Sequence, residues 1–138
     1  MHWDLSLAAT LDHLGVEHYP DVAEIGAGLD DGHVVWQQLG EESDPVFGGD
    51  ALTGVTVDLD FRARSSIAAR ALADRTLAAL RRAGALQRIT TTVRLYEPDP
   101  EPLRRIVVSV TISAYFSPPR TRIVTGRAFS ADFQAAFA

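Results

Sequence analysis

Cysteine and lysine are both missing from the 138 residues of the chain. Without cysteine it can form no disulfide, thiolate zinc site, cysteine nucleophile or CxxC redox pair. Without lysine it has no Schiff-base or P-loop lysine, and all 13 of its basic residues are arginine. Its apolar runs are far shorter than the ~20 residues that span a bilayer. Since Met1–Asp4 lacks the basic region of a signal peptide, we expect a cytoplasmic chain with no membrane partner.

The composition that remains is that of a globular protein. Hydrophobic residues make up 46% of the chain and charged residues 22%, which argues against intrinsic disorder. The length corresponds to one ordinary domain. The net charge of −5 argues weakly against free nucleic acid as the main partner.

The charge is divided unevenly along the chain. Residues 1–61 contain 13 acidic residues and no arginine, whereas residues 62–138 contain all 13 arginines and only 5 acidic residues. One interpretation is that the two halves neutralise each other within one fold. The other is that an acidic face of one copy meets a basic face of the next.

Hydrophobic periodicity predicts two helices and four strands. Residues 52–63 alternate strictly, with Val55, Val57, Leu59 and Phe61 on one face and Asp58, Asp60 and Arg62 on a wet face. Ser65 or Ser66 precedes an Ala/Leu/Arg helix that Gly84 ends. The predicted elements are a helix over 4–14, strands over 33–39 and 52–63, a helix over 67–83, and strands over 89–96 and 106–115. Residues 15–32 and 40–51 are predicted as loops because glycine, proline and acidic residues punctuate them.

This order predicts an α+β fold, with helices on one face of a mostly antiparallel four-stranded sheet. We expect a domain over residues 1–116 and a C-terminal arm over 117–138. Between the last two strands, the segment 97–102 (Glu-Pro-Asp-Pro-Glu-Pro) predicts an acidic hairpin tip. Ser130 is expected to cap a short helix in the arm.

No catalytic, cofactor-binding or metal-binding pattern is present. The spacing over 26–32 is GxGxxxG, so a turn is favoured over a nucleotide loop. His13 and His18 are five residues apart, which does not place them on one helix face, and a solvated or edge position is expected for both. Asp58 and Asp60 are expected to form salt bridges with Arg62 and Arg64.

Three stretches resemble those of one protein family. The run 33–37 (His-Val-Val-Trp-Gln) is similar to its first strand, and 55–80, with Ala-Leu-Ala-Asp at 71–74, is similar to its strand-then-helix core. The Leu-Tyr-Glu-Pro turn at 95–98, followed by 104–116, is similar to its last hairpin. In these stretches the chain resembles the tail-terminator (tail-completion) proteins of long-tailed phages and phage-like particles, the U-like minor tail proteins.

The resemblance implies a non-enzymatic virion protein at the head-proximal end of the tail, assembled in the host cytoplasm. It would form a ring, typically a hexamer, that caps the completed tail tube and joins the tail to the head. Its partners would be further copies of itself, the major tail tube protein and the head-tail connector or neck protein. DNA would pass through the lumen without sequence readout.

The residues expected at interfaces lie on the wet strand face, the hairpin tip and the arm, where they would supply complementary charge and hydrophobic anchors. They are Asp58, Asp60, Arg62, Arg64, Glu97, Asp99, Glu101, Arg120, Arg122, Arg127, Phe129, Phe133 and Phe137.

Two other functions stay open. A small dimeric ligand-binding domain would need a closed apolar pocket around Trp36 and Phe61. An enzyme would need His18 or His33 beside a carboxylate in a cleft.

Overall fold

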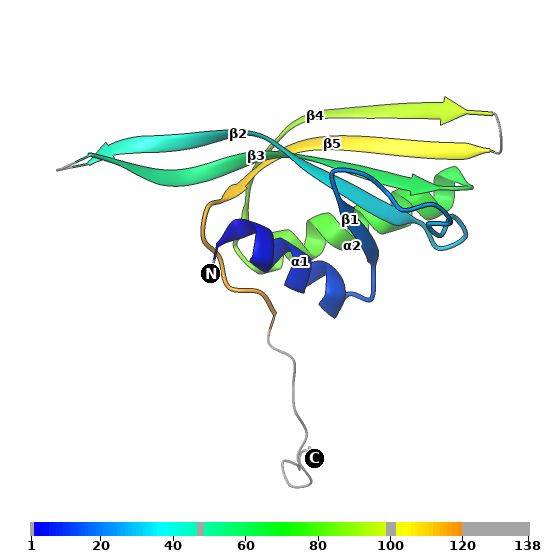
Figure 1. Cartoon of the computed structure of the whole chain (residues 1–138), viewed down its shortest axis with the longest axis horizontal. Coiled ribbons are helices and arrows are strands. Elements are labelled where there is room, and N and C mark those ends of the chain that lie inside the picture. The colour runs from blue at the N-terminus through cyan, green and yellow to red at the C-terminus, as the bar shows by residue number, and fades with distance from the viewer. Residues whose placement is uncertain (1, 47–48, 99–101, 120–138) are drawn as a thin grey trace, which may run out of the picture.

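The chain folds into one twisted sheet with two helices against the same face. The computed structural model describes residues 2–46, 49–98 and 102–119. The elements are α1 (Trp3–His13), β1 (Glu17–Pro20), β2 (His33–Val46), β3 (Gly49–Ala63), α2 (Ser66–Arg82), β4 (Leu86–Glu97) and β5 (Leu103–Ser113). Figure 1 shows both helices below the sheet, which leaves its other face, the outer face, uncovered by helix. The predicted α+β class, with helices on one face, is therefore confirmed.

The sheet has five strands in the order β1-β2-β3-β5-β4. All neighbours are antiparallel except β1 and β2, which run parallel from Glu17 opposite His33 to Pro20 opposite Trp36. The prediction of four strands was wrong because it left β1 inside a loop. A strand of four residues that ends in proline is too short to show alternation.

A long β2–β3 hairpin replaces the loop predicted over 40–51. β2 continues to Val46, and β3 begins at Gly49. Cross-strand pairing continues from Glu41 opposite Val55 to Val46 opposite Gly49, with one register shift between Glu42 and Ser43. Pairing with β3 therefore outweighs the low strand propensity of the glycines and Pro45. The hairpin extends beyond both helices (Figure 1).

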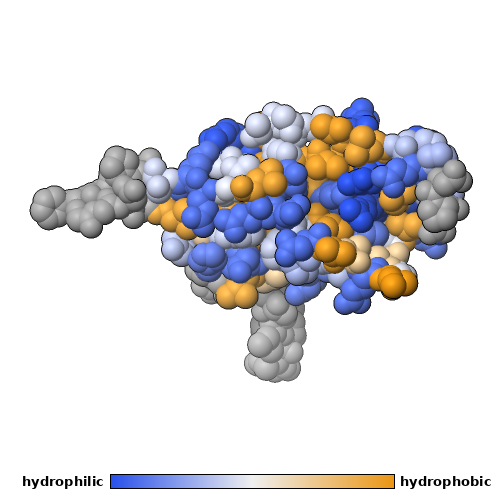
Figure 2. All heavy atoms as spheres, turned by 45° about the horizontal axis from the view of Figure 1, so that its top comes forward, coloured by the Kyte–Doolittle hydropathy of each residue, from blue (hydrophilic) through white to orange (hydrophobic). Residues whose placement is uncertain are grey.

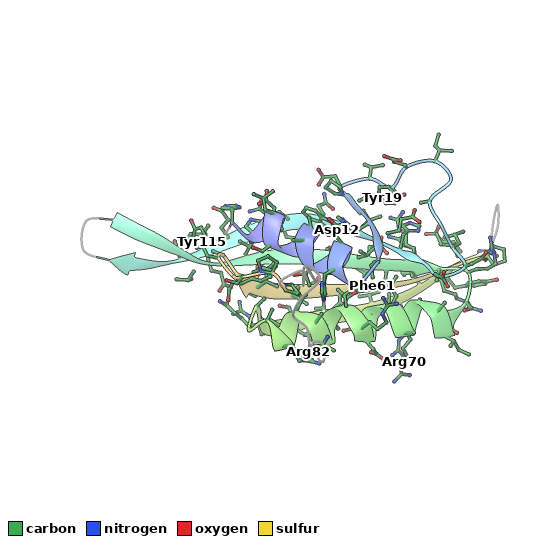
Figure 3. The ribbon with its side chains drawn as sticks, turned by 90° about the horizontal axis from the view of Figure 1, so that it is seen from below. Asp12, Tyr19, Phe61, Arg70, Arg82 and Tyr115 are labelled. Carbon is green, nitrogen blue, oxygen red and sulfur yellow. The ribbon has the colours of Figure 1, made fainter. Side chains whose placement is uncertain are left out.

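The core lies between the sheet and the two helices. Val55, Val57, Leu59 and Phe61 of β3 are fully buried, as the alternation predicted. Seen from the helix side, Phe61 lies between α1 and α2 (Figure 3). Each such side chain contributes about 1.5–3 kcal/mol relative to an exposed one.

The boundaries of α2 agree with the prediction. Ser65 is its N-cap, and the side chain accepts a hydrogen bond from the Ala68 N–H at 3.1 Å. Gly84 follows the helix with φ +69°, a left-handed conformation that glycine adopts without steric cost. The buried face of α2 begins with Ala69 and Leu72.

The described part of the chain contains no helix that is long and apolar enough to cross a membrane. Asp99 and Glu101 of the predicted hairpin tip lie outside the described residues. So do the predicted short helix and the predicted interface residues of the arm, which are Arg120, Arg122, Arg127, Phe129, Phe133 and Phe137.

Candidate functional site

The outer face of the sheet carries most of the predicted interface residues that fall within the described part of the chain. On β3 this face presents Asp58, Asp60 and Arg62, opposite Ser109, Val107 and Arg105 of β5. In Figure 2 the outer face is turned toward the viewer, and apolar patches lie between hydrophilic ones.

Asp60 is buried on this face, which corrects the prediction that it is solvated. Its side chain is only 10% exposed. Nη2 of Arg62 donates to Asp60 Oδ2 at 2.8 Å, and Nη2 of Arg105 donates to the same oxygen at 2.7 Å. Both arginines lie across the sheet surface and exclude water from the carboxylate, so this residue is buried by long polar side chains rather than by apolar packing.

Glu97 extends this ionic cluster to the end of β4. Nη1 of Arg105 donates to Glu97 Oε2 at 2.9 Å. The hydrogen bond to Asp60, and then that to Glu97, raise the pKa of Arg105 above its ordinary value. Two carboxylates and two guanidiniums balance, so Asp60, Arg62, Arg105 and Glu97 contribute little net charge to this face.

Asp58 of β3 and Arg64, which directly follows β3, also have partners within the chain. Asp58 accepts a hydrogen bond from the Ser109 hydroxyl. Arg64 pairs with Asp30 in the loop before β2, and not with Asp58 or Asp60. The predicted salt bridging is thus confirmed for Asp60 with Arg62 and wrong in the partner of Arg64.

Among the described residues, four ion pairs join the acidic and basic halves of the chain. They are Asp30–Arg64, Glu42–Arg88, Asp60–Arg62 and Asp60–Arg105. These pairs support the interpretation that the halves neutralise each other within one fold. The arginines that take no part in these ion pairs are the ones available to a partner.

Several of those arginines line a groove that the sequence did not predict. The groove has a volume of about 420 Å³ and lies between the first turn of α2 and the adjoining ends of β4 and β5. Its walls include Ile67, Arg70, Arg94, Tyr96 and Arg104. Arg70 projects from α2 on the side away from α1 (Figure 3). We call this the basic groove.

The described carboxylates compensate the positive charge of the basic groove only in part. The Arg104 guanidinium lies 3.7 Å from the centre of the Tyr96 ring, a cation–π contact that leaves the charge in place. Nε of Arg70 lies 4.0 Å from Oδ2 of Asp74, one turn further along α2. Among the described residues no carboxylate forms a salt bridge with Arg94 or Arg104. Tyr96 directly opposes Arg104, so the Arg94-x-Tyr96 spacing was the sequence signal that could have placed these residues on one face.

β4 forms an open edge of the sheet. In the described ranges it pairs with β5 alone, and every residue from Gln87 to Glu97 is exposed. Val93 is 48% exposed and Leu95 42%. The pairing with β5 continues without a register shift from Thr91 to Glu97, so one row of backbone N–H and C=O groups faces outward along a regular strand.

Two histidines of the described residues, His18 and His33, are held by hydrogen bonds within the fold. Nε2 of His18 lies 2.8 Å from Asp12 Oδ1, and Nδ1 accepts from Trp36 Nε1 at 3.3 Å. Both ring nitrogens are therefore engaged, and the ring is mostly buried. His18 lies on the edge strand β1, so the edge position expected for it is confirmed. The buried His33 ring has Nδ1 2.6 Å from the Gly28 carbonyl oxygen. The described residues hold no group of three potential metal ligands.

The side chains named for a ligand pocket are part of the packed core. Phe61 is fully buried. Trp36 packs edge-to-face on Trp3, with 5.7 Å between ring centres. These aromatic rings connect α1 to the sheet.

No protein-family model matches the chain, and no curated protein is similar to it in sequence.

Proposed function

We propose that the protein is a structural subunit that acts by self-association. It forms a ring that caps the completed tail tube of a phage or phage-like particle and joins the tail to the neck. The observation that carries this proposal is the open β4 edge, with apolar side chains exposed along it.

An exposed strand edge of this length favours assembly for a physical reason. Natural sheets protect their edges with short strands, proline, lysine or bulges, because an open edge pairs with other chains. At the opposite side of the sheet β1 is short and contains Pro20. β4 is neither short nor interrupted by proline over Thr91–Glu97, and it exposes Val93 and Leu95 to solvent. A neighbouring subunit would satisfy the backbone groups and bury these side chains.

The resemblance supports the particular kind of assembly. The three similar stretches include β2, the β3–α2 unit and the β4–β5 hairpin, which are the elements that build the sheet. Tail terminators of this type are rings, so the proposed partners are further copies of this chain, in a hexamer, together with the tail tube protein and the connector. The ring acts through its contacts and without catalysis, and DNA crosses its lumen without sequence readout.

Immunoelectron microscopy of purified particles tests the proposal. An antibody against this chain is expected to label the head-proximal end of the tail, in particles released by the organism that encodes it. The double variant Val93→Glu and Leu95→Glu should lose this label, because it introduces charge along the assembly edge. Ile25→Glu, which changes a fully exposed residue far from β4, is the matched control. Label elsewhere on the particle, or none in the wild type, would contradict the proposed function.

A further inference from the structure

The sheet has a second open edge, on the outer side of the β2–β3 hairpin. β1 covers β2 only from His33 to Trp36. From Gln37 to Val46 no strand within the described ranges pairs with that side of β2. Leu39 lies at a register shift on this segment and is 55% exposed, so it adds an apolar contact to the edge. We call residues 37–46 the acidic segment.

The acidic segment is opposite in charge to the basic groove. It contains Glu41, Glu42 and Asp44 and no basic residue. Glu42 is paired with Arg88, whereas Glu41 is exposed and its only described partner is the uncharged Gln38 amide. The basic groove presents Arg94 and Arg104 without carboxylate partners among the described residues, so each surface lacks what the other provides.

The two surfaces lie at opposite ends and on opposite edges of one molecule. In Figure 1 the β2–β3 hairpin extends to one side, and the start of α2 with the ends of β4 and β5 lies at the other. In the strand order, β2 and β4 are separated by β3 and β5. The acidic segment therefore cannot contact the basic groove of its own copy.

We propose that the acidic segment of one copy docks along β4 and the basic groove of the next copy. The inference deepens the proposed function and rests on it. Backbone hydrogen bonds between two open edges would join the sheets, as in strand addition. Carboxylates of the acidic segment would then lie beside Arg94 and Arg104, which sets the direction of docking. Because the contact uses two different surfaces, its repetition generates a closed ring when the rotation permits closure.

Disulfide trapping tests this contact directly because the chain has no cysteine of its own. One chain carries Ser43→Cys on the acidic segment, and another carries Ile67→Cys at the wall of the basic groove. Both positions are exposed, so neither change should impair folding. On mixing and oxidation, the heterodimer should exceed that formed by the control pair of Ser43→Cys with Arg81→Cys by at least about tenfold, because docking raises the local thiol concentration. Equal yields from the two pairs would overturn the inference.

Charge exchange tests the direction of docking. Arg94→Glu with Arg104→Glu in the Ile67→Cys chain should reduce the trapped heterodimer to the control level. Adding Glu41→Arg with Asp44→Arg to the Ser43→Cys chain should restore it, because the charges again oppose each other. Arg81→Glu with Arg82→Glu, on α2 outside the groove, should leave the yield unchanged. Trapping that is insensitive to the first pair of changes, or not restored by the second, would contradict this charge pairing.

A chain with both Ser43→Cys and Ile67→Cys separates this inference from the proposed function. In purified particles it should give a ladder of covalent multimers. Label at the head-proximal end without such a ladder would refute the contact and leave the proposed function standing. A ladder of covalent multimers from the isolated protein, with no label at the head-proximal end of the tail, would support the contact and refute the proposed function.

Discussion

Asp60 holds together two arginines that directly oppose each other on neighbouring strands. Arg62 of β3 pairs in register with Arg105 of β5. Like charges in directly opposed positions destabilise a sheet. Oδ2 of Asp60 lies 2.8 Å from Nη2 of Arg62 and 2.7 Å from Nη2 of Arg105, so one carboxylate offsets the repulsion and connects the acidic half of the chain to the basic half.

Removing the charge of Asp60 should therefore destabilise the fold. Asp60→Asn is expected to lower the free energy of unfolding by about 2 kcal/mol, because it leaves two partly buried guanidiniums facing each other. Urea unfolding measures this change, and the m-value should stay the same. Asp58→Asn is the control, since an amide oxygen can still accept the Ser109 hydroxyl bond. Equal losses for the two variants would show that the opposed arginines need no counter-charge.

The N-cap of α2 should contribute a measurable part of the stability. Ser65→Ala removes the acceptor of the Ala68 N–H and should cost about 1 kcal/mol. Ser66→Ala changes a neighbouring exposed hydroxyl, and a change within about 0.5 kcal/mol is expected. Thermal unfolding of both variants measures the difference, and a reversed order would assign the cap to Ser66.

Tyr19 should ionise at a higher pH than an ordinary tyrosine. Its hydroxyl donates a hydrogen bond to Glu17, and this bond raises the pKa of Tyr19 to about 12 from its ordinary value of 10.0. The ultraviolet absorbance of tyrosinate, titrated in the wild type and in Tyr19→Phe, isolates this residue by difference. Glu17→Gln should return the pKa of Tyr19 toward 10.0, because a neutral amide stabilises the phenol less. An unchanged titration in Glu17→Gln would disprove the role of this bond.

The same contact should make stability depend on pH in the acid range. Hydrogen bonds from Tyr19 and from the Gly28 N–H lower the pKa of Glu17 below its ordinary value of 4.5. A carboxylate whose pKa is lowered by folding stabilises the fold fully above its ordinary pKa, and this contribution is lost as pH falls through the lowered value. As pH falls from the ordinary pKa of Glu17 to its lowered value, the urea midpoint of the wild type should fall more steeply than that of Glu17→Gln. Glu24→Gln, a change at an exposed carboxylate in the following loop, should keep the wild-type slope.

The elements that the sequence predicts well are those with strong local signals. The alternation over 52–63 describes a strand with one buried face, and Ser65 and Gly84 bracket a helix of good helix formers. The elements missed, β1 and the outer part of the β2–β3 hairpin, lack an alternating pattern of their own and are held by pairing with the neighbouring strand. Short strands and glycine-rich strands acquire their structure from their neighbours, so local pattern carries little information about them.

The candidate site was predicted in part for a related reason. Period-two alternation places Asp60 and Arg62 on the same face, but it does not reveal that Arg105, 45 residues further on, folds over the carboxylate. The basic groove depends on the pairing of β4 with β5 and on where α2 begins. Arg70, Arg94 and Arg104 are far apart in sequence, and only the fold brings them to one groove.

The edge-to-face contact of Trp3 with Trp36 gives the molecule an internal optical reporter. These are the only two tryptophans of the chain, and both belong to the junction between α1 and the sheet. Detachment of the N-terminal helix would therefore change the emission of every indole at once. The fluorescence spectrum can thus show that a charge-reversed or edge-modified variant is still intact, independently of whether its copies join.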